Sequence, residues 1–152
     1  MSFKIRRVFL LQVLCPLFIG AFIYFCLSPE AIFVRILVPE MGRDFKECEL
    51  VKELARSPVR IFLPDMLWSY ALVWMLYLIM KTETTDTVFE KNKSVGLQEI
   101  FSIAFVFSAV MEILQLVPAI TGTFDPVDIL VEALAEILAV LNIKTFMRRH
   151  WI

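Results

Sequence analysis

The sequence predicts an all-α integral membrane protein: a four-transmembrane-helix bundle with both termini in the cytoplasm and an amphipathic helical outer segment between spans 1 and 2. Three observations support this fold class. Hydrophobic residues make up 59% of the 152 residues, and the mean hydropathy is +0.75, whereas soluble domains are typically about 45–50% apolar. The apolar residues gather in runs of about 20, which is the helical length that crosses roughly 30 Å of hydrocarbon. Basic residues flank these runs in an ordered way.

Four apolar runs are expected to cross the membrane, at about residues 8–27, 61–80, 97–117 and 126–146. All four should be helices, because a lone strand leaves its backbone groups unpaired in lipid. The first run follows the basic "FKIRR" and could be a signal peptide, but it is about 20 residues long and no small-x-small cleavage site follows it. We therefore treat residues 1–152 as a single membrane domain.

The orientation follows from the positions of Lys and Arg. Three segments that must share one side of a four-span protein are basic: the N-terminus, the 81–96 loop and the C-terminus. Their basic residues are Lys4, Arg6, Arg7, Lys81, Lys91, Lys93, Lys144, Arg148 and Arg149. The 118–125 loop has neither Lys nor Arg. The sequence therefore predicts an N-in, C-in topology with the 118–125 loop outside.

The long extracytoplasmic segment 28–60 has mixed charge, with two Lys, four Arg and six acidic residues. Its stretch "FKECELVKELARS" has the pattern of a charged amphipathic helix, which is typical of segments that lie on a membrane surface. Two interpretations remain open: an outer cap over the bundle, or a mobile lid over a site.

Several function classes are disfavoured by composition. The net charge of −1 gives no sign of nucleic-acid binding. The single histidine, His150, is near the C-terminus, which argues against a His base or a His-rich metal site. The three cysteines have no metal-ligand spacing, and no P-loop, nucleophile elbow or zinc motif is present.

Acidic side chains interrupt the last two apolar runs, although each charge near the bilayer centre costs roughly 2.5–3.5 kcal/mol on insertion scales. Glu112 and Gln115 share one helix face, and Asp128, Glu132 and Glu136 recur every four residues on another. The short loop between the two helices makes them antiparallel neighbours. The helical rise then sets Gln115 level with Asp128 and Glu112 level with Glu132. The two faces should therefore meet and line one acidic pocket that opens to the outer leaflet.

Other polar residues near the outer ends have two interpretations each. Asp65 either joins the pocket or belongs to a helix start within an aromatic interface belt. In "FDPVD", Asp125 fits a helix N-cap and Pro126 the first helical position. Asp128 also complements the positive helix end, although its side chain can still turn inward.

Gln115 and Glu136 also have more than one interpretation, and so does the way in which the charge of the acidic group is neutralised. Gln115 suits an interhelical hydrogen bond as well as a ligand contact, and Glu136 suits a buried, protonated acid bonded to a neighbouring helix. Carboxylates this close need protons, a cation or basic partners. Segment 28–60 offers arginines, of which Arg60 or Arg56 is expected to fold over the pocket.

The stretch from residue 111 to residue 141 resembles the VanZ-like family. Its "EILQ" at 112–115 and its "TFDPVD" ending at Asp128 match that family's E-x-x-Q pair, short loop and D-x-x-D-like element before the final helix. The resemblance places Glu112, Gln115, Asp128 and Asp125 among the family's functional residues. It implies a small protein of the bacterial inner membrane, in a family whose namesake is associated with glycopeptide antibiotic resistance. The family's usual asparagine is replaced here by Glu132.

Three functions follow as hypotheses. The first is binding or remodelling of a lipid, a lipid-linked glycan or an amphiphilic cell-envelope compound, whose cationic or hydroxyl-rich head enters the pocket. The second is a membrane enzyme acting on a lipid head group. The third is a structural subunit of a membrane complex, paired with basic residues of a partner protein.

The candidate residues for these functions overlap. The ligand-binding candidates are Glu112, Gln115, Asp125, Asp128, Glu132 and Asp65. For the enzyme, Glu112 and Asp128 are the candidate catalytic acid–base pair. Glu112, Gln115, Asp128 and Glu132 are candidate ligands for a divalent cation, since carboxylate and amide oxygens suit Mg²⁺ or Ca²⁺.

Overall fold

The computed structural model describes residues 3–27, 59–86, 96–116 and 125–150, and every regular element within these ranges is helical. The first hydrophobic run forms α1 (Phe3–Phe9), a π-helical turn η1 (Leu10–Leu14) and α2 (Cys15–Leu27). The later runs form α6 (Val59–Asp86), α7 (Leu97–Leu114) and α8 (Pro126–His150). The expected cap or lid at 28–60 lies almost entirely outside the described residues, as do most of the 118–125 loop and the side chains of Arg56 and Arg60.

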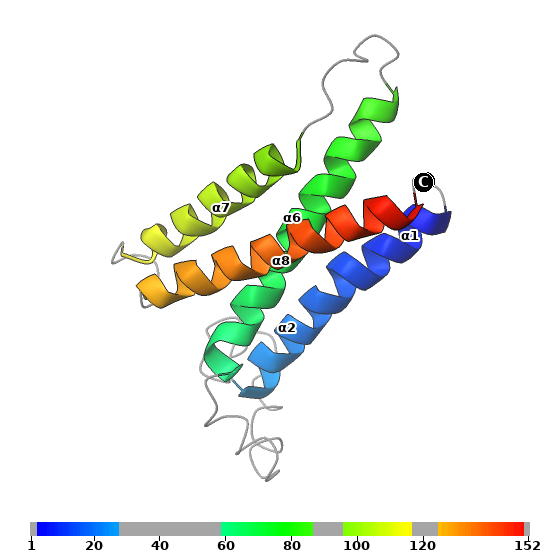
Figure 1. The fold of residues 1–152 in the computed structure, drawn as a ribbon. Coiled ribbons are helices and arrows are strands. Elements are labelled where there is room, and N and C mark those ends of the chain that lie inside the picture. The colour runs from blue at the N-terminus through cyan, green and yellow to red at the C-terminus, as the bar shows by residue number, and fades with distance from the viewer. Residues whose placement is uncertain (1–2, 28–58, 87–95, 117–124, 151–152) are drawn as a thin grey trace.

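Helix α6 is the centre of the molecule, because α2, α7 and α8 all pack against it. Figure 1 shows successive long helices running in alternating directions, as the predicted up-and-down bundle requires. The C-terminal end of α8 and the start of α1 lie at the same end of the molecule (Figure 1). This arrangement brings the end of α7 and the start of α8 together at the far end.

Three helices are long and apolar enough to cross a membrane: Ile5–Ile23, Phe62–Lys81 and Leu97–Leu114. The all-helical class and the first three predicted spans therefore agree with the structure. The fourth predicted span, about residues 126–146, corresponds to α8. This helix is not among the three, because it has more acidic and basic residues than they have in their apolar stretches. The fourth crossing and the N-in, C-in orientation stay predictions.

The helix ends differ from the expected ones in several places. The first helical run begins at Phe3 rather than at residue 8, and α6 ends at Asp86 rather than at residue 80, inside the predicted 81–96 loop. Helix α7 ends at Leu114 rather than at Val117, and Pro118 accounts for the difference because a proline disfavours helical backbone at the residue before it. Helix α8 continues to His150, four residues past the expected end.

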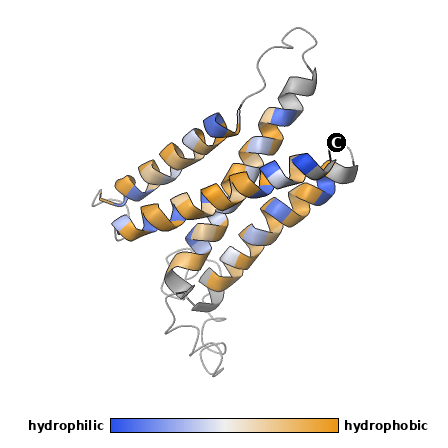
Figure 2. Cartoon of the chain, viewed as in Figure 1, coloured by the Kyte–Doolittle hydropathy of each residue, from blue (hydrophilic) through white to orange (hydrophobic). Residues whose placement is uncertain are grey.

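The outer surface of α8 is apolar, with Leu130, Leu134 and Leu138 each more than half exposed. Its acidic residues Glu132 and Glu136 are buried instead. Figure 2 shows hydrophobic colour along most of each helix, interrupted by isolated polar positions on α8. Apolar side chains outside and carboxyl groups inside are the distribution expected for a helix that contacts lipid.

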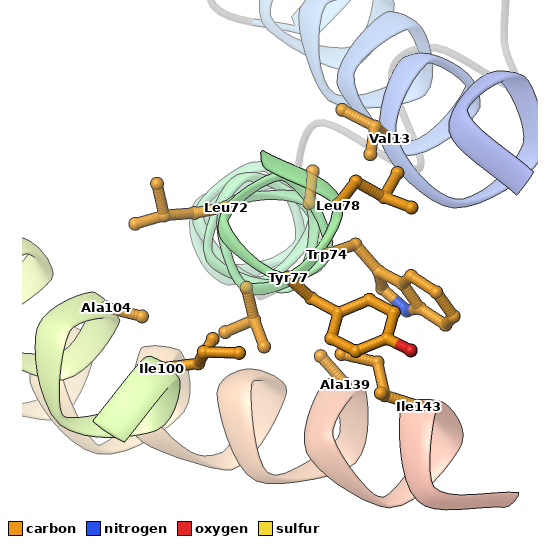
Figure 3. Close-up of a cluster of buried hydrophobic side chains, with 11 residues drawn as sticks. Val13, Leu72, Trp74, Tyr77, Leu78, Ile100, Ala104, Ala139 and Ile143 are labelled. Atoms are coloured by element: carbon orange, nitrogen blue, oxygen red, sulfur yellow. The ribbon is translucent and has the colours of Figure 1, made fainter. Parts of the chain in front are cut away.

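The apolar core surrounds α6, as Figure 3 shows in a view along that helix. Val13 contributes from the first helix, while the other side is formed by Ile100 and Ala104 of α7 and Ala139 and Ile143 of α8 (Figure 3). The two alanines are fully buried. Small residues at such contacts let helices approach closely, and close packing drives helix association in lipid.

The Trp74 ring stands edge-on to two other rings in this core. Its centroid lies 5.8 Å from that of Tyr77 and 5.9 Å from that of Phe146 on α8. Edge-to-face pairs of this kind contribute about 0.5–1.5 kcal/mol beyond the area that they bury. They help to fix α8 against α6.

A polar network centred on Tyr70 joins three of the helical segments. The Tyr70 hydroxyl donates to Gln12 Oε1 in η1, and it accepts from Trp74 Nε1 at 3.1 Å and from Asn142 Nδ2 of α8 at 2.7 Å. A phenol has one donor and two acceptor lone pairs, so this hydroxyl is saturated. The network therefore fixes the relative positions of η1, α6 and α8.

The π-helical turn that carries Gln12 has a local cause. Pro16 has no backbone N–H, and a proline ring clashes with the carbonyl of the residue four positions earlier, which is Gln12. The Cys15 N–H instead reaches the Leu10 carbonyl, five residues back. Such π-helical insertions in α-helices are frequent at functional sites. This one carries Gln12, whose side-chain oxygen accepts the hydrogen bond from the Tyr70 hydroxyl.

Replacing Tyr70→Phe should destabilise the protein by roughly 2 kcal/mol, because three hydrogen bonds worth about 0.6 kcal/mol each in membrane proteins are lost. The free energy of unfolding in mixed micelles of dodecyl maltoside and sodium dodecyl sulfate measures this. Tyr77→Phe is the matched control, since its hydroxyl accepts from the Lys81 ammonium at 3.2 Å rather than joining helices. Equal losses in the two variants would contradict the proposed role of the Tyr70 network.

Candidate functional site

The start of α8 is capped by Asp125, as the sequence predicted. The Asp125 Oδ1 atom accepts the Val127 N–H at 2.9 Å, and the Asp125 carbonyl accepts the Asp128 N–H at 3.0 Å. Pro126 is the first helical residue, where its missing N–H costs nothing. This cap occupies one carboxylate oxygen of Asp125 and sets the direction in which α8 leaves the loop.

The end of α7 places Gln115 beside Glu112. The Gln115 Nε2 atom donates to Glu112 Oε1 at 2.7 Å. This bond lies within one chain segment, so an interhelical hydrogen bond and a ligand contact for Gln115 both stay predictions. Gln115 lies just beyond the last helical residue, three positions after Glu112, within reach of its carboxylate.

Helices α7 and α8 pack with their acidic faces together. The Ser108 Oγ of α7 donates to Glu136 Oε1 of α8 at 2.9 Å, and this hydrogen bond is buried. One turn along α7 and one turn back along α8, Glu112 and Glu132 interact electrostatically. This is the antiparallel register expected from the helical rise, and the interhelical hydrogen bond expected for Glu136 is present.

Asp65 of α6 belongs to the same group. Both Glu132 and Glu112 interact electrostatically with Asp65, and Glu132 also interacts with Asp128 and Glu136 of its own helix. We call these five side chains (Asp65, Glu112, Asp128, Glu132 and Glu136) the carboxyl cluster. It draws on three helices, and Asp125 lies at its edge through its interactions with Glu112 and Asp128.

Three members of the carboxyl cluster are withdrawn from the surface, whereas Asp65 and Asp128 are partly exposed. The exposed fraction is 6% for Glu112, 5% for Glu132 and 0% for Glu136. Within the described residues, one oxygen of each of these carboxyls, always Oε2, is buried without a hydrogen-bond partner, as is Asp128 Oδ1. An unsatisfied buried polar group costs about 1–3 kcal/mol, and a charged one costs more. Among the described residues, four carboxyl oxygens of Glu112, Asp128, Glu132 and Glu136 therefore have no donor.

Two serines of the site were missed by the reasoning from sequence. Ser108 precedes Glu112 by one turn on the same face of α7. Ser69 stands one turn after Asp65 on α6, is fully buried, and its Oγ has no hydrogen-bond partner in the described part of the chain. A search for small polar residues four positions from each acid would have found both.

The structure gives no positive support for a metal site. In the described ranges, no group of three or more His, Cys, Asp or Glu side chains is arranged to hold a metal ion. A surface hollow is present at the other end of α7, lined by Gly96, Gln98, Glu99, Ser102 and Ile103, away from the carboxyl cluster. The opening of an acidic pocket to the outer leaflet stays a prediction, since segments 28–58 and 117–124 are not described.

Comparisons with protein-family models, with curated proteins and with solved structures found no match for this chain. The interpretation of the site therefore depends on its own geometry and on the sequence resemblance given above.

Replacing Ser108→Ala should destabilise the protein by roughly 0.5–1.5 kcal/mol, because it leaves Glu136 Oε1 without its buried donor. Ser102→Ala on the same helix is the matched control, since the Ser102 hydroxyl is exposed and donates to the Gln98 carbonyl of its own helix at 2.9 Å. Both changes carry the same gain in helix propensity. Thermal unfolding in detergent measures the difference, and a Ser108→Ala variant as stable as Ser102→Ala would contradict the role of this bond.

Proposed function

We propose that this chain is a VanZ-like protein of the bacterial inner membrane whose carboxyl cluster binds the polar head of a lipid, a lipid-linked glycan or an amphiphilic cell-envelope compound. A cationic or hydroxyl-rich head group would supply hydrogen-bond donors to the carboxyl oxygens that have none among the described residues, while the acyl chain would lie against the apolar outer surface. The family's association with glycopeptide antibiotic resistance would then concern a compound of the cell envelope.

Support for the family comes from the position of its two motifs. The E-x-x-Q pair at 112–115 ends α7, and the D-x-x-D-like element at 125–128 opens α8. The interactions of Glu112 with Asp125 and Asp128 bring the two motifs into one place. Residues separated by a loop in sequence thus form one group, as a shared functional role requires.

Support for a fourth span comes from the two faces of α8. The helix has 25 residues, about 37 Å at 1.5 Å per residue, which exceeds the hydrocarbon thickness. Its exposed large side chains from Val127 to Leu141 are all apolar, whereas Glu132 and Glu136 are buried. Charges that face the bundle interior are the usual arrangement in membrane helices. With four spans, the basic ends of the chain would share the cytoplasmic side.

The observation that carries the proposal is the set of buried carboxyl oxygens on Glu112, Asp128 and Glu132 that have no hydrogen-bond partner among the described residues. Buried polar groups in native proteins are nearly always hydrogen-bonded, and the exceptions call for an explanation such as a ligand, an ion or water. These three residues lie within the first turns of α8 and the last turn of α7, where a head group at the membrane surface could reach them.

An enzyme acting on a lipid head group is the alternative that the same geometry favours next. In the described part of the chain, Glu112 and Asp128 each retain one oxygen without a partner, as an acid–base pair requires if it is to reach a substrate. A bound Mg²⁺ or Ca²⁺ would need further ligands from Gln115 or Glu132. A structural subunit would instead satisfy the cluster with Lys or Arg from a partner's span.

Native mass spectrometry of the detergent-purified chain, incubated with bacterial polar lipid extract, tests the proposal. We expect a lipid or lipid-linked compound to be retained by the wild type and lost from the double variant Glu112→Gln/Glu132→Gln, because amides cannot hold a cationic head. Glu99→Gln is the matched control, since Glu99 is an exposed carboxylate at the other end of α7.

The alternatives give different results in the same preparation. Thermal stabilisation by Mg²⁺ or Ca²⁺ that disappears in the double variant would favour the enzyme. Recovery of one stoichiometric protein partner would favour the structural subunit. Equal lipid retention by the wild type and the double variant would rule out the carboxyl cluster as the binding site.

A further inference from the structure

We infer that the basic residues at the start of the first helical run and at the end of the last helix bind the phosphate of an anionic phospholipid. The four residues are Arg6 and Arg7 of α1 and Lys144 and Arg148 of α8, and we call them the basic end. The basic end lies at the opposite end of the bundle from the carboxyl cluster (Figure 1). The inference therefore goes beyond the proposed function and does not depend on it.

One hydroxyl group fixes how the first helical run and α8 lie relative to each other. Gln12 of η1 and Asn142 of α8 both bond to the Tyr70 hydroxyl. Arg6 lies six residues before Gln12, and Arg148 lies six residues after Asn142, which is about 9 Å along an α-helix. Because the start of α1 and the end of α8 are at the same end of the molecule (Figure 1), the two arginines lie at a similar depth.

Apolar side chains hold both helix ends against the core and leave the basic side chains outside. Ile5, Val8 and Phe9 of α1 and Phe146 and Met147 of α8 are partly buried against the core. The four side chains of the basic end are exposed. They therefore project from helix ends whose positions are fixed by packing, and α1 is itself continued by η1 and α2.

Exposed leucines lie one helical turn inward from three of the four basic residues. Leu10 and Leu11 follow the two arginines of α1 by four residues, and each is 54% exposed. Leu141 precedes Lys144 by three residues and is 53% exposed. Residues three or four apart share a helix face. These faces are thus apolar toward the middle of the bundle and basic toward its end, which matches the acyl chains and the phosphate of a phospholipid.

Charge complementarity favours an anionic lipid over a zwitterionic one. Residues 3–14 and 137–150 contain no Asp or Glu, so these two helix ends add only positive charge to the surface. Arginine binds phosphate through two parallel hydrogen bonds, and basic residues beside a membrane helix attract anionic lipids. A lipid with a negatively charged head group, such as phosphatidylglycerol, would contact both the charges and the leucines, whereas a soluble phosphate would contact the charges alone.

Native mass spectrometry of the full chain in detergent tests the inference, with dioleoyl-phosphatidylglycerol and dioleoyl-phosphatidylcholine titrated separately. Each Lys or Arg beside an anionic lipid contributes roughly fivefold to binding. We therefore expect phosphatidylglycerol to bind at least about twentyfold more tightly than phosphatidylcholine, and Arg6→Gln/Arg148→Gln to weaken its binding by about twentyfold. Unchanged phosphatidylcholine binding and melting temperature show that the variant is folded. If it does not fold, Arg7→Gln/Lys144→Gln takes its place.

Two further variants separate phosphate recognition from a general effect of charge. Arg6→Lys/Arg148→Lys should keep most of the preference for phosphatidylglycerol, because lysine also binds phosphate, as a point charge. Arg35→Gln/Arg43→Gln is the matched control, since it removes the same charge from segment 28–58. It should leave the affinity for phosphatidylglycerol unchanged.

Equal affinity for the two lipids, or equal losses in the two glutamine variants, would overturn the inference. Binding of soluble glycerol phosphate as tightly as phosphatidylglycerol would overturn a lipid as the partner. The mass of the retained lipid keeps the two sites apart. Glu112→Gln/Glu132→Gln should lose the ligand of the carboxyl cluster and still retain phosphatidylglycerol. If phosphatidylglycerol is itself the lipid that this variant loses, it binds at the carboxyl cluster, and the inference fails while the proposed function stands.

Discussion

The constraint on which the rest of the structure depends is that carboxyl groups cannot face lipid. Helix α8 has acids at every fourth position over three turns, and α7 has Ser108 and Glu112 one turn apart. Only one relative rotation of two antiparallel helices hides both series, and it is the one observed, with Ser108 bonded to Glu136 and Glu112 beside Glu132. In lipid there is no hydrophobic driving force between helices, so these polar contacts and close packing at small residues determine how the helices pair.

Two polar groups of the described residues differ in character. The Tyr70 hydroxyl uses its donor and both acceptor positions on protein partners, as a group does when its role is to hold helices together. The carboxyl cluster leaves four oxygens without partners in the described residues. Asn142 of the Tyr70 network lies six residues beyond Glu136 on the same helix, about 9 Å along its axis, so the satisfied and the unsatisfied groups are neighbours within one fold.

Much of this arrangement could be predicted from residue spacing. Hydrophobic runs gave the helices, "FDPVD" gave the cap at Asp125, and the four-residue period gave the α7–α8 register. The Tyr70 network could not be predicted, because it joins residues 58 and 72 positions apart in sequence, and its partner Gln12 is positioned by a π-helical turn that depends on Pro16. The direction of the Gln115 side chain could not be predicted from residue spacing either, since it depends on where α7 ends.

The composition of α8 illustrates why a helix must be judged by its faces. By overall composition, α7 is apolar enough to cross a membrane and α8 is not, because of its acidic residues and its basic end. Yet the exposed large residues of α8 from Val127 to Leu141 are all apolar. Insertion costs apply to charges that contact hydrocarbon. If the carboxyls of α8 meet only other helices, the energy that matters for crossing is that of its outer surface, and the fourth span that we propose follows from that surface.

The geometry of the individual carboxyls argues against a purely adhesive role for the cluster. In Glu112 and Glu136, one oxygen is held by a protein donor, Gln115 Nε2 or Ser108 Oγ, while the other oxygen has no partner among the residues that the structure describes. Helix adhesion alone would be served by serine or amide pairs whose groups are all satisfied, and each partnerless oxygen works against it. A carboxyl that is held on one side by a protein donor and has no partner among the described residues on the other is instead oriented toward a further contact, which is the property of a binding site whose first contacts are held in place by supporting residues.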